Sequence, residues 1–80
     1  MDVWGLGALL YALLTAELPF WSDNKRERNR RVINEPLDLE RSHSVRKLSP
    51  EVKNLLAGML EKNPDERLTI EQVLAHPWII

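Results

Sequence analysis

The sequence predicts an all-α protein, and three observations support this fold class. Apolar residues recur at helical spacing in the second half of the chain, and two segments carry strong helix-start signals. No segment alternates apolar and polar residues as a half-buried strand would. The 80 residues correspond to one domain or to a part of one, in which we expect four helices.

The first expected helix covers residues 3–14 and is apolar on every side. A helix without a polar stripe belongs in the interior of a larger structure. Asp2 is placed to cap its N-terminus through the carboxylate, and Pro19 cannot continue it. The run is shorter than the roughly 20 residues that a bilayer span needs. It also lacks the flanks of a signal peptide, so we expect neither a membrane nor an export segment.

The second expected helix is polar and runs from a cap at Ser22 or Asp23 to about Ile33. A solvated helix face is the simplest interpretation of its charge. A docking surface for an acidic partner is the second interpretation. Nucleic acid and calmodulin are disfavoured, because no aromatic residues interleave for base stacking and apolar anchors are sparse. Its basic residues are Lys25, Arg26, Arg28, Arg30 and Arg31.

Residues 34–48 are expected to form an irregular connection, after which a third helix begins at Ser49 with Pro50 in its first turn. This cap role explains Ser49 better than a phosphorylation site does. We expect the helix to continue until Pro64 stops it. Its apolar residues form one stripe: Val52, Leu55, Leu56, Met59 and Leu60.

The fourth expected helix is short. Thr69 and Gln72 have the spacing of a capping box, and Pro77 ends the segment. The preceding acidic turn is expected to be solvated, and the three tryptophans are expected to pack rather than to form a binding platform.

Composition excludes several kinds of partner and binding site. Eleven basic and twelve acidic residues leave a net charge of −1, so no whole-protein field attracts nucleic acid or a membrane surface. Without cysteine there is neither a disulfide nor a Cys-based metal site. His43 and His76 lack paired ligand spacing. We therefore predict no metal-binding, cofactor-binding or catalytic residue in this sequence.

Five short motifs follow one another in a specific order. Asp2, Trp4 and Gly7 precede a Leu-Pro-Phe segment, and a Leu-Ser-Pro-Glu segment leads into the third helix. An Asn-Pro-x-x-Arg-Leu-Thr segment that contains Arg67 and a final His-Pro-Trp segment complete the set. Together they resemble the C-terminal lobe of serine/threonine protein kinases. Residues 1–80 are thus expected to be a partial kinase domain, most similar to the calcium/calmodulin-dependent group, which includes calcium-dependent protein kinases.

The resemblance makes Asp2, Trp4, Gly7 and Arg67 structural anchors of the kinase lobe. It implies that Asp2 binds the backbone of the catalytic loop and that Arg67 pairs with the glutamate of an Ala-Pro-Glu motif. Neither partner segment occurs in this sequence. Within the chain alone we therefore expect Asp2 to act as a plain cap. We expect Arg67 to be exposed or paired with a nearby carboxylate such as Glu71, because burial of an unpaired guanidinium is costly.

The function implied for the parent is transfer of the γ-phosphoryl group of ATP, with Mg²⁺, to a protein hydroxyl. This sequence has no Gly-rich loop, phosphate-binding lysine, catalytic aspartate or Asp-Phe-Gly motif, so the chain alone is expected to be inactive, without ATP or Mg²⁺. Its expected role is scaffold and substrate docking in an intracellular, cytoplasmic kinase. The alternative is a stand-alone, non-catalytic interaction module that acts through the basic helix 22–33. A weaker third reading is a basic-helix binder of calmodulin or nucleic acid.

The expected partners are the remainder of the kinase domain and a protein substrate or regulator. Because the helices that would wrap residues 3–14 are missing from the sequence, we also expect the isolated chain to self-associate. Three positions depart from the family pattern: Gly5 replaces a common serine, Ala16 a common glycine, and Ala12 a glutamate that some members use for a basic substrate residue. The last departure argues against carrying over arginine recognition at that position.

Overall fold

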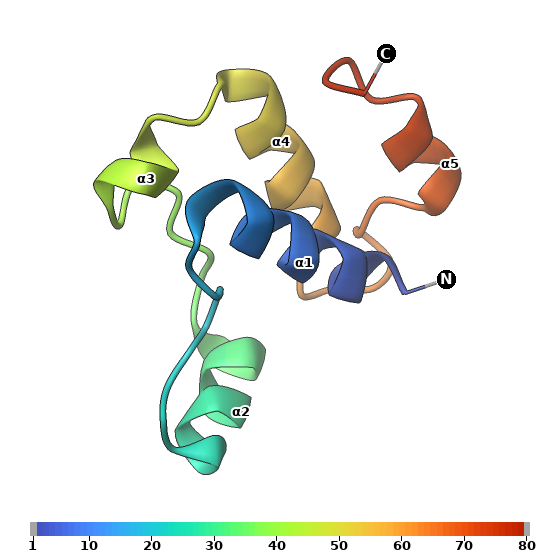
Figure 1. Cartoon of the computed structure of the whole chain (residues 1–80). Helices are drawn as coiled ribbons and strands as arrows, with labels where there is room; N and C mark the ends of the chain where they lie inside the picture. The colour runs from blue at the N-terminus through green and yellow to red at the C-terminus, as the bar shows by residue number, and fades with distance from the viewer. Residues whose placement is uncertain (1, 80) are drawn as a thin grey trace.

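The computed structural model describes residues 2–79, which form five α-helices and no strand. The all-α prediction is confirmed, whereas the prediction of four helices is wrong by one. In Figure 1, α1 lies across α4, α3 and α5 flank this pair, and α2 projects away from the others. The helices are α1 (Val3–Thr15), α2 (Lys25–Asn34), α3 (His43–Arg46), α4 (Pro50–Met59) and α5 (Ile70–Leu74).

The core lies mainly between α1 and α4. On α1 the buried residues Gly7, Tyr11 and Thr15 recur every four positions and so form one side of the helix. At Gly7 the backbones approach so closely that an added Cβ would lie 2.8 Å from the Met59 Cβ. The predicted stripe of α4 is confirmed, since Val52, Leu55, Leu56, Met59 and Leu60 are all buried.

α4 begins as predicted but ends earlier. Ser49 Oγ accepts a hydrogen bond from the Val52 N–H at 3.3 Å, and Pro50 occupies the first turn. The helix ends at Met59 rather than at Pro64, because the chain turns back over it. The Leu68 N–H donates to the Gly58 carbonyl at 3.0 Å, and the Leu68 side chain fills the space that a Cβ on Gly58 would need.

The capping box of α5 is confirmed in both directions. The Gln72 N–H donates to Thr69 Oγ1 at 3.2 Å, and the Thr69 N–H donates to Gln72 Oε1 at 2.8 Å. After α5, the buried His76 ring lies 2.8 Å from Asn54 Oδ1 and accepts the Trp78 N–H at Nδ1 (3.1 Å). These contacts fix the last described turn against α4.

The short helix α3 lies in the stretch that we expected to be irregular. Ser42 Oγ accepts the Val45 N–H at 3.3 Å and donates to Glu17 Oε2 at 2.6 Å. Val45 is fully buried in the core cluster around Tyr11. A single turn of helix has too few residues to show a period, so its stability comes from these tertiary contacts.

The cap of α2 is Asn24, which corrects the prediction of Ser22 or Asp23. Asn24 Oδ1 accepts the Arg26 and Glu27 N–H groups at 2.9 and 3.2 Å. Ser22 Oγ accepts the Asn24 N–H at 3.2 Å and so supports the cap from outside. α2 buries none of its residues, in contrast to every other helix.

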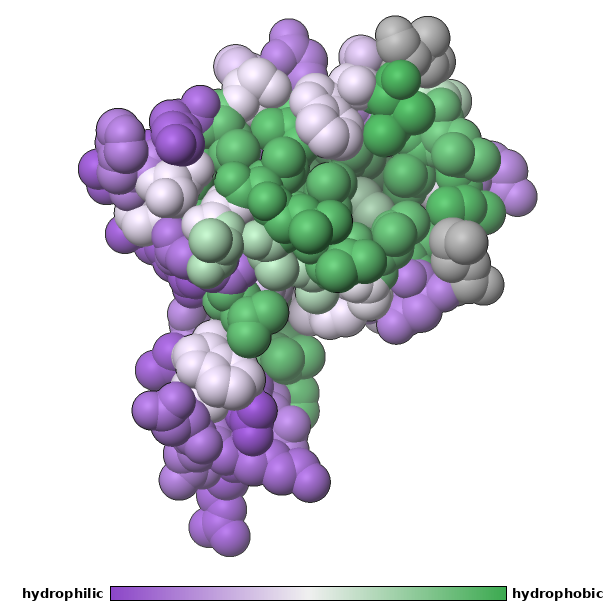
Figure 2. All heavy atoms as spheres, viewed as in Figure 1, coloured by the Kyte–Doolittle hydropathy of each residue, from purple (hydrophilic) through white to green (hydrophobic). Residues whose placement is uncertain are grey.

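Figure 2 shows apolar side chains gathered over the body of the molecule, whereas the projecting α2 is hydrophilic. Much of this apolar surface belongs to α1, where Leu13 is 74% and Leu9 56% exposed. Leu74, Trp78 and Ile79 are further exposed apolar residues. None of the helices in residues 2–79 has the length and hydropathy needed to cross a membrane.

Candidate functional site

Two aromatic rings and two cations gather where α1, the turn that follows it and the end of α4 meet. Trp4 stacks on Phe20 with ring centroids 5.8 Å apart. Lys62 Nζ lies 3.8 Å from the centroid of Phe20 and 5.6 Å from that of Trp4. The Arg67 guanidinium lies 5.3 Å from the Trp4 centroid. Each cation is thus within the range in which the negative face of an aromatic ring attracts it.

Arg67 is half-buried, and it is held by backbone carbonyls rather than by a carboxylate. Its Nε–H donates to the Glu61 carbonyl at 2.8 Å and its Nη2 to the Lys62 carbonyl at 3.2 Å. Neither expected arrangement is therefore correct, since Arg67 is not exposed and forms no ion pair with Glu71. The turn closes through Asn63, which accepts the Arg67 N–H and presents these carbonyls to the guanidinium.

Lys62 connects this turn to the end of α2. Its ammonium donates to the Val32 carbonyl at 2.8 Å and to the Arg31 carbonyl at 3.4 Å. Cations near the last carbonyls of a helix oppose the negative end of its dipole. Burial lowers the pKa of Lys62, while Glu35 and Glu61 partly oppose the shift. Sequence reasoning missed this residue, because a lysine in a polar turn carries no signal of its aromatic surroundings.

A cavity of about 350 Å³ opens beside the aromatic pair and is lined by Trp4, Val32, Ile33, Lys62 and Arg67. We call it the Trp4 pocket. No carboxylate in residues 2–79 forms an ion pair with either of its two cations. The Trp4 pocket can therefore accept an anionic group that has an apolar neighbour, because charge and apolar surface occur together in it.

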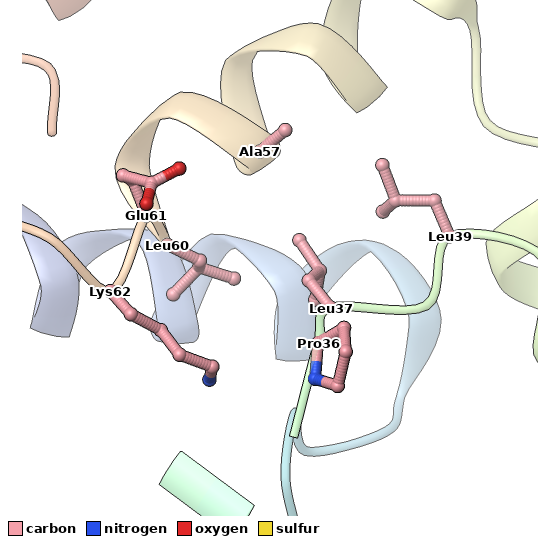
Figure 3. A pocket seen from close by; sticks show the side chains of 7 residues that line it. All are labelled: Pro36, Leu37, Leu39, Ala57, Leu60, Glu61 and Lys62. Carbon is pink, nitrogen blue, oxygen red and sulfur yellow. The ribbon is translucent and has the colours of Figure 1, made fainter. Parts of the chain in front are cut away.

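A second cavity of about 290 Å³ lies between the connection after α2 and the end of α4. Figure 3 shows the side chains of Leu37, Leu39 and Leu60 around it, with Glu61 and Lys62 at its edge. Lys62 lines both cavities, so the two adjoin at this residue. This second cavity is mainly apolar and brings together no pair of catalytic groups.

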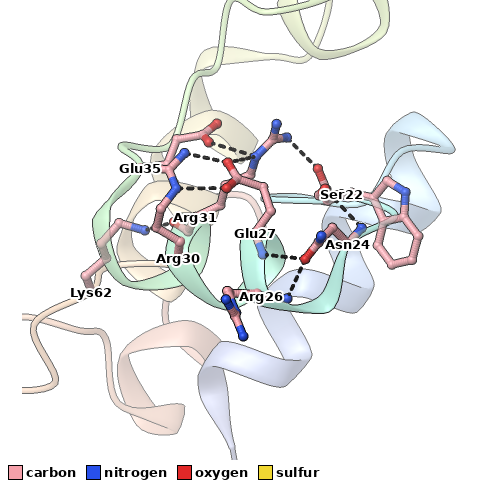
Figure 4. Close-up of polar contacts among 9 residues, drawn as sticks. Ser22, Asn24, Arg26, Glu27, Arg30, Arg31, Glu35 and Lys62 are labelled. Atoms are coloured by element: carbon pink, nitrogen blue, oxygen red, sulfur yellow. Dashed lines mark hydrogen bonds and ion pairs between the residues drawn. The ribbon is translucent and has the colours of Figure 1, made fainter.

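The basic residues of α2 divide into two groups. Arg30 and Arg31 both contact Glu27, and Arg31 also lies 3.5 Å from Glu35 (Figure 4). The hydrogen bond from Arg30 is the main reason why the pKa of Glu27 falls to about 2. Two of the five basic residues of the predicted positive patch are thus paired with carboxylates at or within the helix.

The remaining cations of α2 have different surroundings. Arg28 lies over the Trp21 ring at 4.6 Å, whereas Lys25 and Arg26 are exposed. In Figure 4, Arg26 points away from the ion pairs of Glu27. The prediction of a docking surface on α2 therefore concerns fewer residues than its five basic side chains, and it stays a prediction.

The predicted anchors do not form one site. Trp4 and Arg67 lie together, Gly7 is buried between α1 and α4, and Asp2 is exposed at the start of α1. The prediction that Asp2 caps α1 through its side chain is wrong. Its carboxylate makes no cap hydrogen bond and instead lies against Gly5, where an added Cβ would be 2.8 Å from Asp2 Oδ2.

Comparisons with known proteins agree with this architecture. Residues 1–79 match the model of the protein kinase domain family. The chain is 42% identical over 78 residues to calcium-dependent protein kinase 25 of Arabidopsis thaliana, covering 98% of this chain and 15% of that protein. Its identity to calcium-dependent protein kinase 21 of Oryza sativa subsp. japonica is 40% over 79 residues, covering 99% and 14%.

The fold agrees with a solved structure as well. The structure of the twitchin kinase region from C. elegans superposes with a TM-score of 0.91 at 32% sequence identity. The match covers 99% of this chain and 14% of that one. The chain thus spans about a seventh of the length of these relatives.

Proposed function

The chain belongs to the protein kinase domain family, and from this premise we propose that it is a non-catalytic part of a serine/threonine kinase domain. In this role it supports the catalytic part and helps to dock substrates. The Trp4 pocket is the observation that carries the proposal, because its two cations have no carboxylate partner in residues 2–79. A glutamate from the Ala-Pro-Glu motif of the remaining kinase domain supplies such a partner.

The exposed side of α1 supports the same proposal. Leu9 and Leu13 are one helical turn apart, so they form a continuous apolar strip away from α4. Full burial of such a side chain contributes about 1.5–3 kcal/mol, which is large for a chain of this size. The remaining kinase domain is the proposed cover of this strip, and it would supply the residues that bind ATP and Mg²⁺. The kinase would act inside the cell, in the cytoplasm.

The size of the native product tests this proposal. An antibody raised against residues 49–80 is used on whole-cell extract, and the precipitated material is assayed for transfer of the γ-phosphoryl group of ATP to a protein substrate. We expect a product several times larger than 9.3 kDa that has kinase activity. A product of 9.3 kDa alone, without activity, would contradict the proposal.

Assembly from two pieces gives a sharper test of the Trp4 pocket. The chain is co-expressed with a separate polypeptide that carries the preceding part of a calcium-dependent kinase domain, and co-purification is measured. We expect Arg67→Ala to reduce co-purification. The matched control is Arg46→Ala, because Arg46 is exposed and bonds only the Glu40 carbonyl in its own neighbourhood. Equal loss for both variants would argue against a role of the pocket.

A stand-alone interaction module is the second candidate function. It is favoured by α2, which projects from the body and buries none of its residues (Figure 1). In this case the native product is 9.3 kDa and a partner protein precipitates with it.

The open side of α1 also leads us to propose that the isolated chain self-associates. Sedimentation of Leu13→Glu tests this idea, since a charge on the exposed strip should shift the chain toward the monomer. An unchanged sedimentation profile would exclude this face as the contact between copies.

A further inference from the structure

The turn after α1 and the start of α2 form an apolar surface. Neither the kinase-domain proposal nor the ion pairs of Arg30 and Arg31 account for this surface. Leu18 is 48% and Trp21 44% exposed, and both line a cavity of about 400 Å³. Ala16, Glu17 and Arg41 complete the lining. We call Leu18, Trp21, Lys25 and Arg28 the Trp21 ledge.

The Trp21 ledge carries positive charge that is not balanced within the described chain. Arg28 lies over Trp21, and its Nε is buried without a hydrogen-bond partner in residues 2–79. A buried donor without an acceptor is costly, so the Arg28 guanidinium is incompletely satisfied within the described residues. Lys25 lies three residues earlier and therefore on the same side of α2. Neither cation forms an ion pair with a carboxylate of the described residues.

The carboxylate in the cavity wall does not cancel this charge. Glu17 Oε1 accepts a hydrogen bond from Arg41 at 3.1 Å, and Glu17 Oε2 accepts one from Ser42 at 2.6 Å. The bond from Ser42 is the main reason why the pKa of Glu17 lies below its usual value. Because Glu17 and Arg41 neutralise each other, the wall is uncharged overall and the ledge remains positive.

We infer that the Trp21 ledge docks a peptide segment of a partner protein in which an apolar residue is flanked by acidic residues. The apolar side chain enters the cavity against Leu18 and Trp21. An adjacent carboxylate accepts hydrogen bonds from Arg28 and attracts Lys25, and charge-assisted bonds of this type are the stronger class. The inference rests on the proposed docking role. The inference assigns the docking role to Lys25 and Arg28. Arg30 and Arg31 are not included, because both already form ion pairs with Glu27.

A binding assay with defined peptides tests the inference on the whole 80-residue chain. The probe is a fluorescein-labelled peptide of sequence Glu-Glu-Leu-Phe-Glu-Glu, and binding is followed by fluorescence anisotropy. Two control peptides replace every Glu by Lys or the Leu-Phe pair by Ser-Ser. We expect measurable affinity for the acidic–apolar peptide only, with weakening by added salt. Equal binding of the acidic and basic peptides, or no binding at all, would overturn the inference.

Three variants of α2 distinguish binding at the Trp21 ledge from a general effect of positive charge. Lys25→Gln and Arg28→Gln should each weaken binding of the acidic–apolar peptide by roughly fivefold, as for charged groups at an interface. Arg30→Gln removes the same charge from the same helix and should leave binding within about twofold. Equal weakening by all three variants would show a diffuse field and contradict the ledge.

The exposure of Lys25 and the design of the assay keep the peptide-binding result interpretable. Lys25 is exposed, so Lys25→Gln leaves the fold intact even if Arg28→Gln disturbs the packing of Trp21. The assay is independent of the size and activity of the native product. Failure of the ledge and failure of the kinase-domain proposal are therefore separate results.

Discussion

α4 buries the apolar stripe that its sequence displays, whereas the more apolar α1 leaves one entire side uncovered. The two helices face each other through Gly7, Tyr11 and Leu56. On the other side of α1, Leu13 is the most exposed of the large apolar residues. An amphipathic helix needs one apolar neighbour, and this chain supplies it to α4. A helix that is apolar all round needs neighbours on every side, and for α1 the described chain provides only part of them.

The largest expected effect comes from a substitution in the buried contact between α1 and α4. Leu56→Ala removes a fully buried side chain from the α1–α4 contact, so it should reduce the free energy of unfolding by about 3 kcal/mol. This is most of the stability available to a domain of this size. Thermal unfolding followed by circular dichroism measures it. Leu13→Ala is the control and should change the stability by less than about 0.5 kcal/mol. Equal effects of both substitutions would refute the contrast between the two sides.

A pair of glycine substitutions sharpens the same comparison. In Gly7→Ala the new Cβ meets the Met59 Cβ in the packed contact. In Gly5→Ala it meets only the end of the exposed Asp2 side chain, which can move away. Both gain the same helix propensity, so the difference between their unfolding free energies isolates the packing term. We expect Gly5→Ala to be the more stable by about 2 kcal/mol in urea denaturation. Equal stability would mean that α1 and α4 do not pack closely at Gly7.

The ends of the two helices also differ. Leu60, the C-cap of α4, has an ordinary φ of −100°, whereas Ala16, the C-cap of α1, lies in the left-handed region with φ 59° and ψ 22°. A side chain is strained in this conformation, and glycine is not. Ala16→Gly should therefore raise the free energy of unfolding by about 1 kcal/mol. Chemical denaturation tests this, and a loss of stability would contradict the left-handed cap.

One polar group on the covered side of α1 has no partner. Tyr11 is fully buried, and its hydroxyl makes no hydrogen bond within the described residues. Burial raises the pKa of Tyr11, with smaller effects from Arg41, Glu17 and Asp38. Tyr11→Phe removes the unsatisfied group while keeping the ring, so it should be neutral or stabilise by less than about 1 kcal/mol. A clear loss of thermal stability would indicate that the hydroxyl has a partner that the fold does not show.

The smallest effect concerns α2, which has no apolar stripe and is held by polar contacts. The pKa of Glu27 is lowered from 4.5 to about 2, mainly by the hydrogen bond from Arg30. The contribution of this carboxylate is therefore present above pH 4.5 and is lost as the pH falls toward 2. Hydrogen exchange of the α2 amides should speed up in this window, and high salt should weaken the dependence. In Glu27→Gln the dependence should disappear, and its persistence would implicate another group.

The start signals of the helices were predictable, because they are local. The cap at Ser49 and the capping box at Thr69 and Gln72 depend on residues within three positions of one another, and both occur as expected. The cap of α2 is Asn24 and not the predicted Ser22 or Asp23. The prediction failed because neighbouring Ser, Asp and Asn side chains can all cap a helix. The choice among them depends on the path by which the chain enters the helix.

The site residues were predictable only in part. The motifs singled out Trp4 and Arg67, and the two residues do lie together. The partners of Arg67 and the position of Lys62 were not predictable, since both depend on how the 61–67 turn closes over Trp4 and Phe20. Asp2 failed as a cap because its carboxylate turns toward Gly5.

The sequence alone thus determined the all-α class, the stripe of α4 and the helix starts, because each depends on short spacing along the chain. It also determined the resemblance to the kinase family, which depends on the order of short motifs. Tertiary structure decided where α4 ends, that α3 forms, and that the Trp4 pocket and the Trp21 ledge exist. The Trp4 pocket and the docking of α3 join residues more than ten positions apart, such as Lys62 with Val32 or Ser42 with Glu17. Only the folded chain brings such distant groups within range of hydrogen bonds and aromatic contacts.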